Sequence, residues 1–306
     1  MDKRGSALLC AISVSVIWGL SFLSTKVAIA ALGPMTIAAA RFVVAVLALV
    51  PVALIAREDL RLRGRDILPM AASGLLGVTL YFLFENNGIA LITASESSLV
   101  VATIPVLTLL VDRAINKVRL GPRSYVGAVL SFAGVALIVA PALGKSSSSI
   151  AGFAYMGGAA ACWVAYALIT KPLSGRYGGL NVTFWQSLFG LLGCLPFAFA
   201  EPRPRSAPGA AVILNLLYLG LLCSAAGYLL YIAAMRRLGA GTTSVFLNLV
   251  PVVSVVGAFF ILGERLGGLS LAGGAVAVAG VYLATSPVRA SVAEEVGKTS
   301  TRGGPS

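Results

Sequence analysis

Long apolar stretches alternate with short polar breaks along almost the whole chain. Each stretch is about 17–25 residues long, the length that a helix needs to cross the hydrocarbon core of a bilayer. Residues 287–306 lose this apolar character and are expected to form a disordered cytoplasmic tail. The pattern predicts an all-α polytopic membrane protein with ten transmembrane helices, each bounded to within about 2–4 residues: 7–31, 35–56, 67–91, 95–112, 124–141, 151–171, 180–200, 210–233, 240–262 and 268–286.

The overall composition agrees with a membrane protein. Hydrophobic residues make up 58% of the 306 residues and charged residues 11%, whereas soluble domains average about 45–50% and about 25%. The net charge of +12 would suggest a nucleic-acid partner for a soluble protein. Lys and Arg in cytoplasmic loops account for this charge here, so we expect no nucleic-acid partner.

The basic residues also predict the orientation. With a cytoplasmic N-terminus, 17 of the 23 Lys and Arg residues fall on the cytoplasmic side. Lys26 and Arg41 lie within spans, and the remaining four basic residues fall on the external side of the membrane. This bias predicts that both termini and the loops 57–66 and 113–123 are cytoplasmic, and that 142–150 and 201–209 are external. The four external basic residues are Lys145, Arg203, Arg205 and Arg265.

The sequence holds few residues of the kinds that enzymes and metal sites use. It has no histidine, and its four cysteines lie inside apolar runs without metal-ligand spacing. Zinc sites, histidine-based catalysis and disulfides are therefore not expected. We predict a protein that is not an enzyme and that binds no metal and no cofactor. The cysteines are Cys10, Cys162, Cys194 and Cys223.

The second half of the chain repeats residues of the first half. The halves, 6–141 and 151–286, are expected to form two domains of five spans each. Because five is odd, the halves enter the membrane from opposite sides, as in the inverted-topology repeats of many secondary transporters. The matched pairs are Trp18 and Trp163, Lys26 and Lys171, and Pro51 and Pro196 at an offset of 145, then Ala94 and Ala240, Pro105 and Pro251, Gly127 and Gly273, and Gly134 and Gly280 at an offset of 146.

Each half contains several short motifs: Trp18-Gly19, Thr25-Lys26, Arg41-Phe42, Ala94-Ser-Glu-Ser-Ser98 and Ile104-Pro105 in the first, and Ala240-Gly-Thr-Thr-Ser244, Leu249-Val-Pro251 and Gly263-Glu-Arg-Leu266 in the second. In these motifs the chain resembles EamA-type transporters of the drug/metabolite transporter superfamily, over about 6–286. One departure is Val118, which stands where the second half has Glu264. The resemblance implies ten helices in two five-helix repeats around a central cavity, and export of small metabolites such as amino acids, amines, sugars or drugs.

Four charged side chains fall in the outer halves of the first four predicted helices: Lys26, Arg41, Glu85 and Glu96. Charged groups are energetically unfavourable at membrane depth, so they normally face protein or water and mark functional sites. Only the lysine recurs in the second half, as Lys171, which we expect to anchor the inner interface. Lys26, Arg41 and Glu96 have an alternative explanation: they snorkel to the outer interface or form structural ion pairs.

Glu85, Asn86 and Asn87 are consecutive, so their side chains point about 100° apart around a helix and cannot all face one surface. Tyr81, Glu85 and Gly88 share a face, which we expect to line the cavity. Glu85 then binds a substrate cation or carries a coupling proton. Amides that do not reach the cavity should bond to neighbouring helices. The alternative role of Glu85 is a buried structural ion pair with Lys26 or Arg41.

Aromatic residues within the spans are candidates for the cavity wall, because aromatic rings suit an amphipathic small molecule. Helix packing is the alternative for each of them. Pro105 and Pro251, at matching positions in the two halves, either kink their helices to shape the cavity or act as hinges. The candidate wall residues are Trp18, Trp163, Trp185, Tyr81, Tyr166, Tyr228 and Tyr231.

The sequence thus predicts a secondary transporter of the cytoplasmic (inner or plasma) membrane that exports a small metabolite by alternating access, with amino acids or related amphipathic compounds as leading substrates. The alternatives are an exchanger for anionic or phosphorylated solutes, with Lys26 and Arg41 as anion ligands, and a general drug or amine exporter. An intramembrane enzyme or a passive pore fits less well. The expected partners are the substrate and the lipid bilayer, with a coupling proton left open; the pattern indicates no particular oligomeric state.

Overall fold

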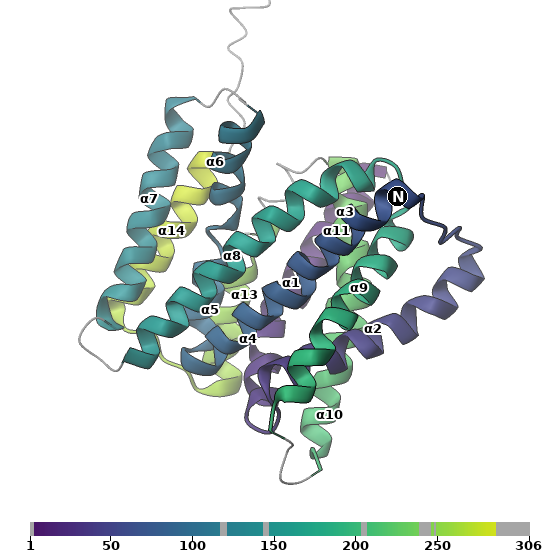
Figure 1. The fold of residues 1–306 in the computed structure, drawn as a ribbon. Helices are drawn as coiled ribbons and strands as arrows, with labels where there is room; N and C mark the ends of the chain where they lie inside the picture. Colours follow the sequence, from purple (N-terminus) through teal and green to yellow (C-terminus); the bar gives the residue numbers. More distant parts are fainter. Residues whose placement is uncertain are drawn as a thin grey trace, which may run out of the picture.

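The structure is a computed structural model, described for residues 3–116, 121–142, 147–202, 207–238, 246–247 and 249–285. Every secondary-structure element in these ranges is a helix, and the helices form one bundle (Figure 1). The predicted tail 287–306, the motif 240–244 and Val118 lie outside the described residues.

The first half of the bundle follows the predicted apolar runs closely. The third run is continuous but changes its winding, because a π-helical turn separates two α-helices. The fourth run is broken at Ala102 and Thr103. Its elements are α1 (Lys3–Ile29), α2 (Pro34–Ala56), α3 (Gly64–Gly74), the π-helix η1 (Leu75–Leu80), α4 (Tyr81–Leu91), α5 (Ala94–Val101), α6 (Ile104–Asn116), α7 (Pro122–Val139) and the 3₁₀ turn η2 (Ala140–Ala142).

The second half repeats this order, including a π-helix in the middle of its third run. At an offset of 146 residues, η1 corresponds to 221–226, which lies within the longer π-helix η3. Its elements are α8 (Ser147–Ser174), α9 (Gly179–Ala200), α10 (Ala210–Leu217), η3 (Tyr218–Ala226), α11 (Gly227–Leu238), α13 (Leu249–Gly257), the π-helix η4 (Ala258–Leu262) and α14 (Gly268–Thr285).

Among the described residues, seven helical segments are long and apolar enough to cross a membrane. Three shorter apolar helices, Pro122–Ile138, Leu249–Leu262 and Gly268–Ala284, lie in the other three predicted runs, so the number of ten spans stays a prediction. Polarity is distributed as lipid requires, since large apolar side chains such as Leu54 (73% exposed) and Phe199 (82%) lie on the outside. The chain is a multi-pass membrane protein.

Two helices from different halves, α7 and α14, lie side by side at one edge of the bundle (Figure 1). Four glycines, which we call the glycine seam, let their backbones touch. A Cβ on Gly127 would lie 2.6 Å from the carbonyl oxygen of Gly280, and one on Gly273 would lie 2.7 Å from that of Gly134. Small residues permit such approaches between membrane helices. The two contacts map onto each other at the repeat offset.

The same reciprocity occurs where α2 meets η3 and where α9 meets the helix that contains η1. A Cβ on Gly74 would lie 2.7 Å from the carbonyl oxygen of Gln186, and one on Gly220 would lie 2.9 Å from that of Arg41. The residues of the second contact are those of the first shifted by the repeat offset. Gly74 and Gly220 are already 146 residues apart, so the one inserted residue of the second half precedes Gly220.

Two carboxylates of the second half cap helices of the first half. Glu201 accepts hydrogen bonds from the backbone N–H groups of Met35 and Thr36, both at 2.8 Å, at the start of α2. Glu264 accepts from Ala94 (3.0 Å) and Ser95 (3.1 Å) at the start of α5. A carboxylate at a helix N-terminus satisfies unpaired N–H groups and opposes the helix dipole. These caps tie the halves together.

Candidate functional site

A cavity lies between the two halves, with about 1270 Å³ of unfilled space, part of it open to the surroundings. Its walls follow single faces of the helices, because the lining residues recur every three or four positions. The main contributions are Trp18, Ser21 and Phe22 from α1, Tyr81, Phe82 and Glu85 from α4, Trp163, Ala167 and Lys171 from α8, and Tyr228, Tyr231 and Met235 from α11.

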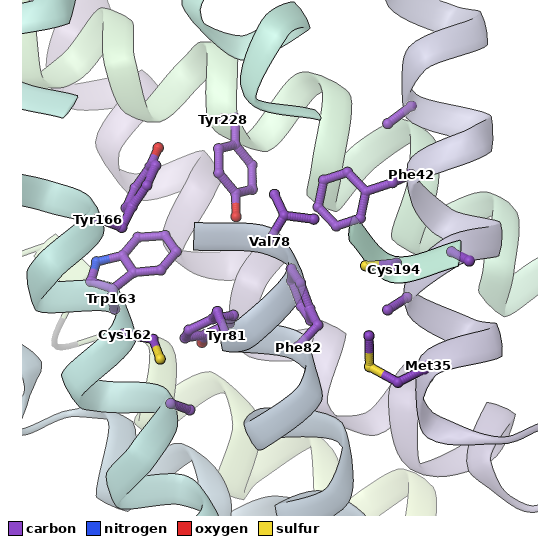
Figure 2. Close-up of a cluster of buried hydrophobic side chains, with 14 of the residues drawn as sticks. Met35, Phe42, Val78, Tyr81, Phe82, Cys162, Trp163, Tyr166, Cys194 and Tyr228 are labelled. Atoms are coloured by element: carbon purple, nitrogen blue, oxygen red, sulfur yellow. The ribbon is translucent and has the colours of Figure 1, made fainter. Parts of the chain in front are cut away.

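Aromatic rings form the middle of the cavity wall. The ring centre of Trp18 lies 5.6 Å from that of Trp163 and 5.4 Å from that of Tyr231. Trp163 also contacts Tyr81, with 5.2 Å between ring centres. Figure 2 shows the rings of Trp163 and Tyr228 above Tyr81 within the buried cluster. The indole N–H of Trp18 donates to the carbonyl oxygen of Cys223 at 3.0 Å, which fixes its ring.

Two buried charges of opposite sign line the same cavity. Glu85, 5% exposed, accepts a 2.6 Å hydrogen bond from the hydroxyl of Tyr81. Arg41 on α2 is 3% exposed, and its Nε donates to the hydroxyl of Ser224 at 2.9 Å. The guanidinium carbon lies 4.2 Å from the ring centre of Phe82, within the range of a cation–π interaction. Of the predicted face, Tyr81 and Glu85 line the cavity, whereas Gly88 packs against Met156 and Gly152 of α8.

Among the described residues, Glu85 is not paired directly with a basic side chain. In the described ranges, both ion pairs within 4.0 Å involve Asp66, with Arg65 and with Arg176. Lys26, the other proposed partner of Glu85, donates instead to the carbonyl oxygens of Ile89 (2.6 Å) and Ile92 (2.7 Å) near the end of α4. The structural ion pair considered from the sequence is thus not formed among the described residues.

The cavity runs from this buried, charged end to the surface. Trp163, Ala167 and Lys171 follow one face of α8, and Lys171 in the last turn of that helix is exposed. A lysine predicted to anchor the inner interface therefore also lines the cavity mouth.

Six other predicted site or wall residues lie away from the cavity. One is Tyr166, whose buried hydroxyl donates to Oε1 of Gln186 at 3.2 Å. Asn86 donates to the carbonyl oxygen of Pro34 on α2, as expected. Asn87 donates to that of Leu83 on its own helix, where a bond to a neighbouring helix was expected. Glu96 forms a capping box with Thr93 at the start of α5. Two more residues, Lys26 and Trp185, donate to backbone carbonyl groups, and the ring of Trp185 stacks on Phe189.

Both predicted prolines line the cavity. Pro105 is the second residue of α6, just after the break between α5 and α6 at Ala102 and Thr103. Proline suits this first turn of a helix, because its missing N–H group has no acceptor there in any case. Pro251 lies on α13, and residues 246 and 247 before that helix are also helical. The hinge role of both residues stays a prediction.

Sequence reasoning did not find Phe82 and Ser224 as contacts of Arg41. Phe82 adjoins Tyr81 in sequence, so its proximity to the cavity was available as a weak signal. Ser224 lies 183 residues from Arg41, and no spacing or motif connects them. Such a pairing depends on how α2 packs against η3.

Comparison with known proteins agrees with this architecture. A family model described as "EamA-like transporter family" matches residues 5–140 and 150–286. A crystal structure superposes with a TM-score of 0.70 and covers 92% of this chain and 98% of its own. Its sequence is 20% identical, so this likeness concerns the fold.

Relatives of known name are similar over nearly their whole length. A "probable terminal-alkyne amino-acid exporter" of Streptantibioticus cattleyicolor is 31% identical over 92% of this chain and 94% of its own. An "uncharacterized transporter" of Archaeoglobus fulgidus is 30% identical over 89% and 94%. A "probable amino-acid metabolite efflux pump" of Salmonella typhimurium is 26% identical over 89% and 92%.

Proposed function

Because the chain belongs to the EamA-like transporter family, we propose that it exports a small metabolite across the cytoplasmic membrane by alternating access, with amino acids or related amphipathic compounds as substrates. The protein is a membrane transporter and not an enzyme. The observation that carries the proposal is the cavity between the halves, where aromatic rings adjoin the buried charges of Arg41 and Glu85. An apolar wall with few polar groups is typical of sites for small molecules.

The names of two relatives favour amino acids as substrates. One is named for amino-acid export and one for efflux of amino-acid metabolites. An amphipathic amino acid also matches the cavity, since the aromatic wall suits an apolar side chain and the charged end suits polar groups.

Alternating access requires two halves that move against each other around a central site. The proposed halves, 6–141 and 151–286, enclose the cavity between them. The glycine seam and the reciprocal contacts of Gly74 and Gly220 support an inverted repeat, because each contact recurs with the halves exchanged. Ten spans with both termini in the cytoplasm follow from this arrangement and from the bias of basic residues.

The proposed topology assigns a side to the cavity mouth. Lys171 ends a helix that runs inward in this topology, so the mouth opens to the cytoplasm. An exporter loads its substrate in such a state. Glu85 is proposed as the residue that carries the coupling proton, since a carboxylate can change its charge and no histidine is present.

Uptake into inverted vesicles tests the function. Purified protein in proteoliposomes, or inverted membrane vesicles, is supplied with a panel of labelled amino acids, amines and sugar phosphates. We expect saturable uptake of apolar or aromatic amino acids that exceeds uptake by empty vesicles. Transport of the sugar phosphates with no transport of amino acids would overturn the proposal in favour of an anion exchanger.

Two structural facts weigh against the anion exchanger. Of its two proposed anion ligands, Lys26 donates to backbone carbonyl groups away from the cavity, and Arg41 shares the cavity with the opposite charge of Glu85. Transport of amines without amino acids in the same panel would identify the general amine exporter instead.

A further inference from the structure

We propose that Arg41 and Glu85 together bind the zwitterionic head group of an α-amino acid. Arg41 takes the carboxylate, Glu85 takes the ammonium group, and the aromatic wall receives an uncharged side chain. The inference rests on the proposed function and names the substrate class within it. It is carried by two buried, oppositely charged side chains that line one cavity without pairing to each other.

Arg41 has donors available for a carboxylate. A guanidinium carries five N–H donors, four of them on its terminal nitrogens. In the described part of the chain, the hydrogen bond of its side chain comes from Nε and goes to Ser224. Phe82 covers a face of the guanidinium and supplies no acceptor oxygen. The terminal nitrogens thus have no protein acceptor among these residues, and a carboxylate matches their fork geometry.

Glu85 has acceptor capacity available for an ammonium group. Its Oε1 accepts the hydrogen bond from Tyr81. No described residue donates to Oε2, although a carboxylate has about four acceptor positions. The Tyr81 bond also fixes the carboxylate in the cavity wall.

Two rings that contact each other connect the two charged groups. Tyr81 and Phe82 are in contact, with 4.9 Å between ring centres. Tyr81 bonds to Glu85 and Phe82 lies under Arg41, yet no nitrogen and oxygen of the two charged groups come within 4.0 Å. A ligand that carries both charges on neighbouring atoms satisfies both groups at once. A ligand with one charge leaves the other buried group unpaired, which is energetically unfavourable.

The rest of the cavity selects the side chain. Trp18, Trp163, Tyr228 and Tyr231 surround the space next to the charged end, and their rings offer apolar faces. Besides Arg41 and Glu85, the described part of the cavity wall holds one more charged residue, Lys171, which lies at the exposed mouth. Apolar and aromatic amino acids are therefore the expected substrates, and acidic or basic ones are excluded.

The test compares one amino acid with two blocked forms of it. The readout is the uptake of labelled phenylalanine into proteoliposomes. Unlabelled phenylalanine, its amide and its N-acetyl form are added separately as competitors. We expect each blocked form to compete at least about tenfold more weakly, because it leaves one charge unpaired. If both blocked forms compete as strongly as free phenylalanine, the inference is overturned, while the proposal of amino-acid export stands. Absence of any amino-acid transport would instead overturn the proposed function.

Two variants assign the head-group contacts. In Arg41→Gln the preference for the free acid over the amide should fall to within about threefold, while rejection of the N-acetyl form persists. In Glu85→Gln the opposite pattern is expected. Arg236→Gln and Glu96→Gln are matched controls, since both side chains lie outside the cavity and should keep both preferences. If a variant no longer transports, a scintillation proximity binding assay measures the same ligand preferences. Unchanged preferences in Arg41→Gln and Glu85→Gln would refute the assignment.

Discussion

Glu85 is a buried carboxylate whose neighbours were in part foreseeable from its own helix. The spacing of four residues places Tyr81 beside it, and the 2.6 Å hydrogen bond between them agrees with that expectation. The turn of about 100° per residue also explains why Asn86 and Asn87 bond to backbone carbonyl groups away from the cavity. Ser224 was beyond reach, because its contact with Arg41 is set by packing between the halves.

Replacing Glu85 by Gln should remove the response of transport to pH. Gln keeps the size of the side chain but cannot take up or release a proton, so remaining efflux becomes independent of external pH. The measurement is efflux of labelled substrate from preloaded right-side-out vesicles at external pH values of about 6 and about 8. In the wild type, external acid should accelerate efflux, because a proton enters as substrate leaves.

The matched change Glu96→Gln should leave this response intact, since Glu96 caps α5 outside the cavity. A Glu85→Gln variant that responds to pH like the wild type would remove the carboxylate from the coupling mechanism.

At the scale of elements, hydrophobic periodicity predicted where the helices lie and missed how some of them wind. The runs 67–91, 210–233 and 240–262 were expected as plain α-helices, but each contains a π-helix. A π-turn uses the same apolar residues as an α-turn, so the sequence pattern does not distinguish them. Pro105 was expected to kink the fourth run or act as a hinge, and the run is instead broken just before it, at Ala102 and Thr103.

The glycine seam makes a prediction about the contact between α7 and α14. A Cβ on Gly134 would lie 2.6 Å from the carbonyl oxygen of Gly273, which is backbone and cannot rotate away. Gly134→Ala should therefore separate the helices and destabilise the protein by about 1–3 kcal/mol. Thermal unfolding in detergent, followed by tryptophan fluorescence, measures the change.

Gly157→Ala on α8 is the control for this substitution. Its Cβ would have no heavy atom within 4 Å, so alanine should leave stability unchanged or raise it by about 0.5–1 kcal/mol. Equal melting temperatures for the two variants would show that the seam is not tightly packed.

At the scale of the whole molecule, composition and repeat offsets were enough to indicate a multi-pass helical transporter. The family model matches the chain in two segments, 5–140 and 150–286, and the division into domains 6–141 and 151–286 stays a prediction. The closed and open ends of the cavity were not foreseeable, because they depend on which helix faces meet. The capping of α2 and α5 by Glu201 and Glu264 likewise joins residues that are 165 to 170 positions apart.

The membrane topology is open to direct measurement. Fusions of alkaline phosphatase and green fluorescent protein should report a cytoplasmic C-terminus, cytoplasmic loops at 57–66 and 113–123, and external loops at 142–150 and 201–209. The physical reason is the excess of Lys and Arg on one side. An external C-terminus would require an odd number of spans and would exclude the inverted repeat.

The glycine seam also bears on the ancestry of the chain. A single five-helix ancestor that packed against a second, inverted copy of itself would make this contact twice from one gene. Such a dimer would hold every charged residue twice, once in each copy, on both sides of its axis. Duplication and fusion of the gene remove this constraint: one copy holds Arg41 and Glu85, and the other has Gln186 and Tyr231 at the matching positions. A cavity with one Arg41–Glu85 pair, in place of two symmetry-related pairs, is therefore a property that only the fused gene can encode.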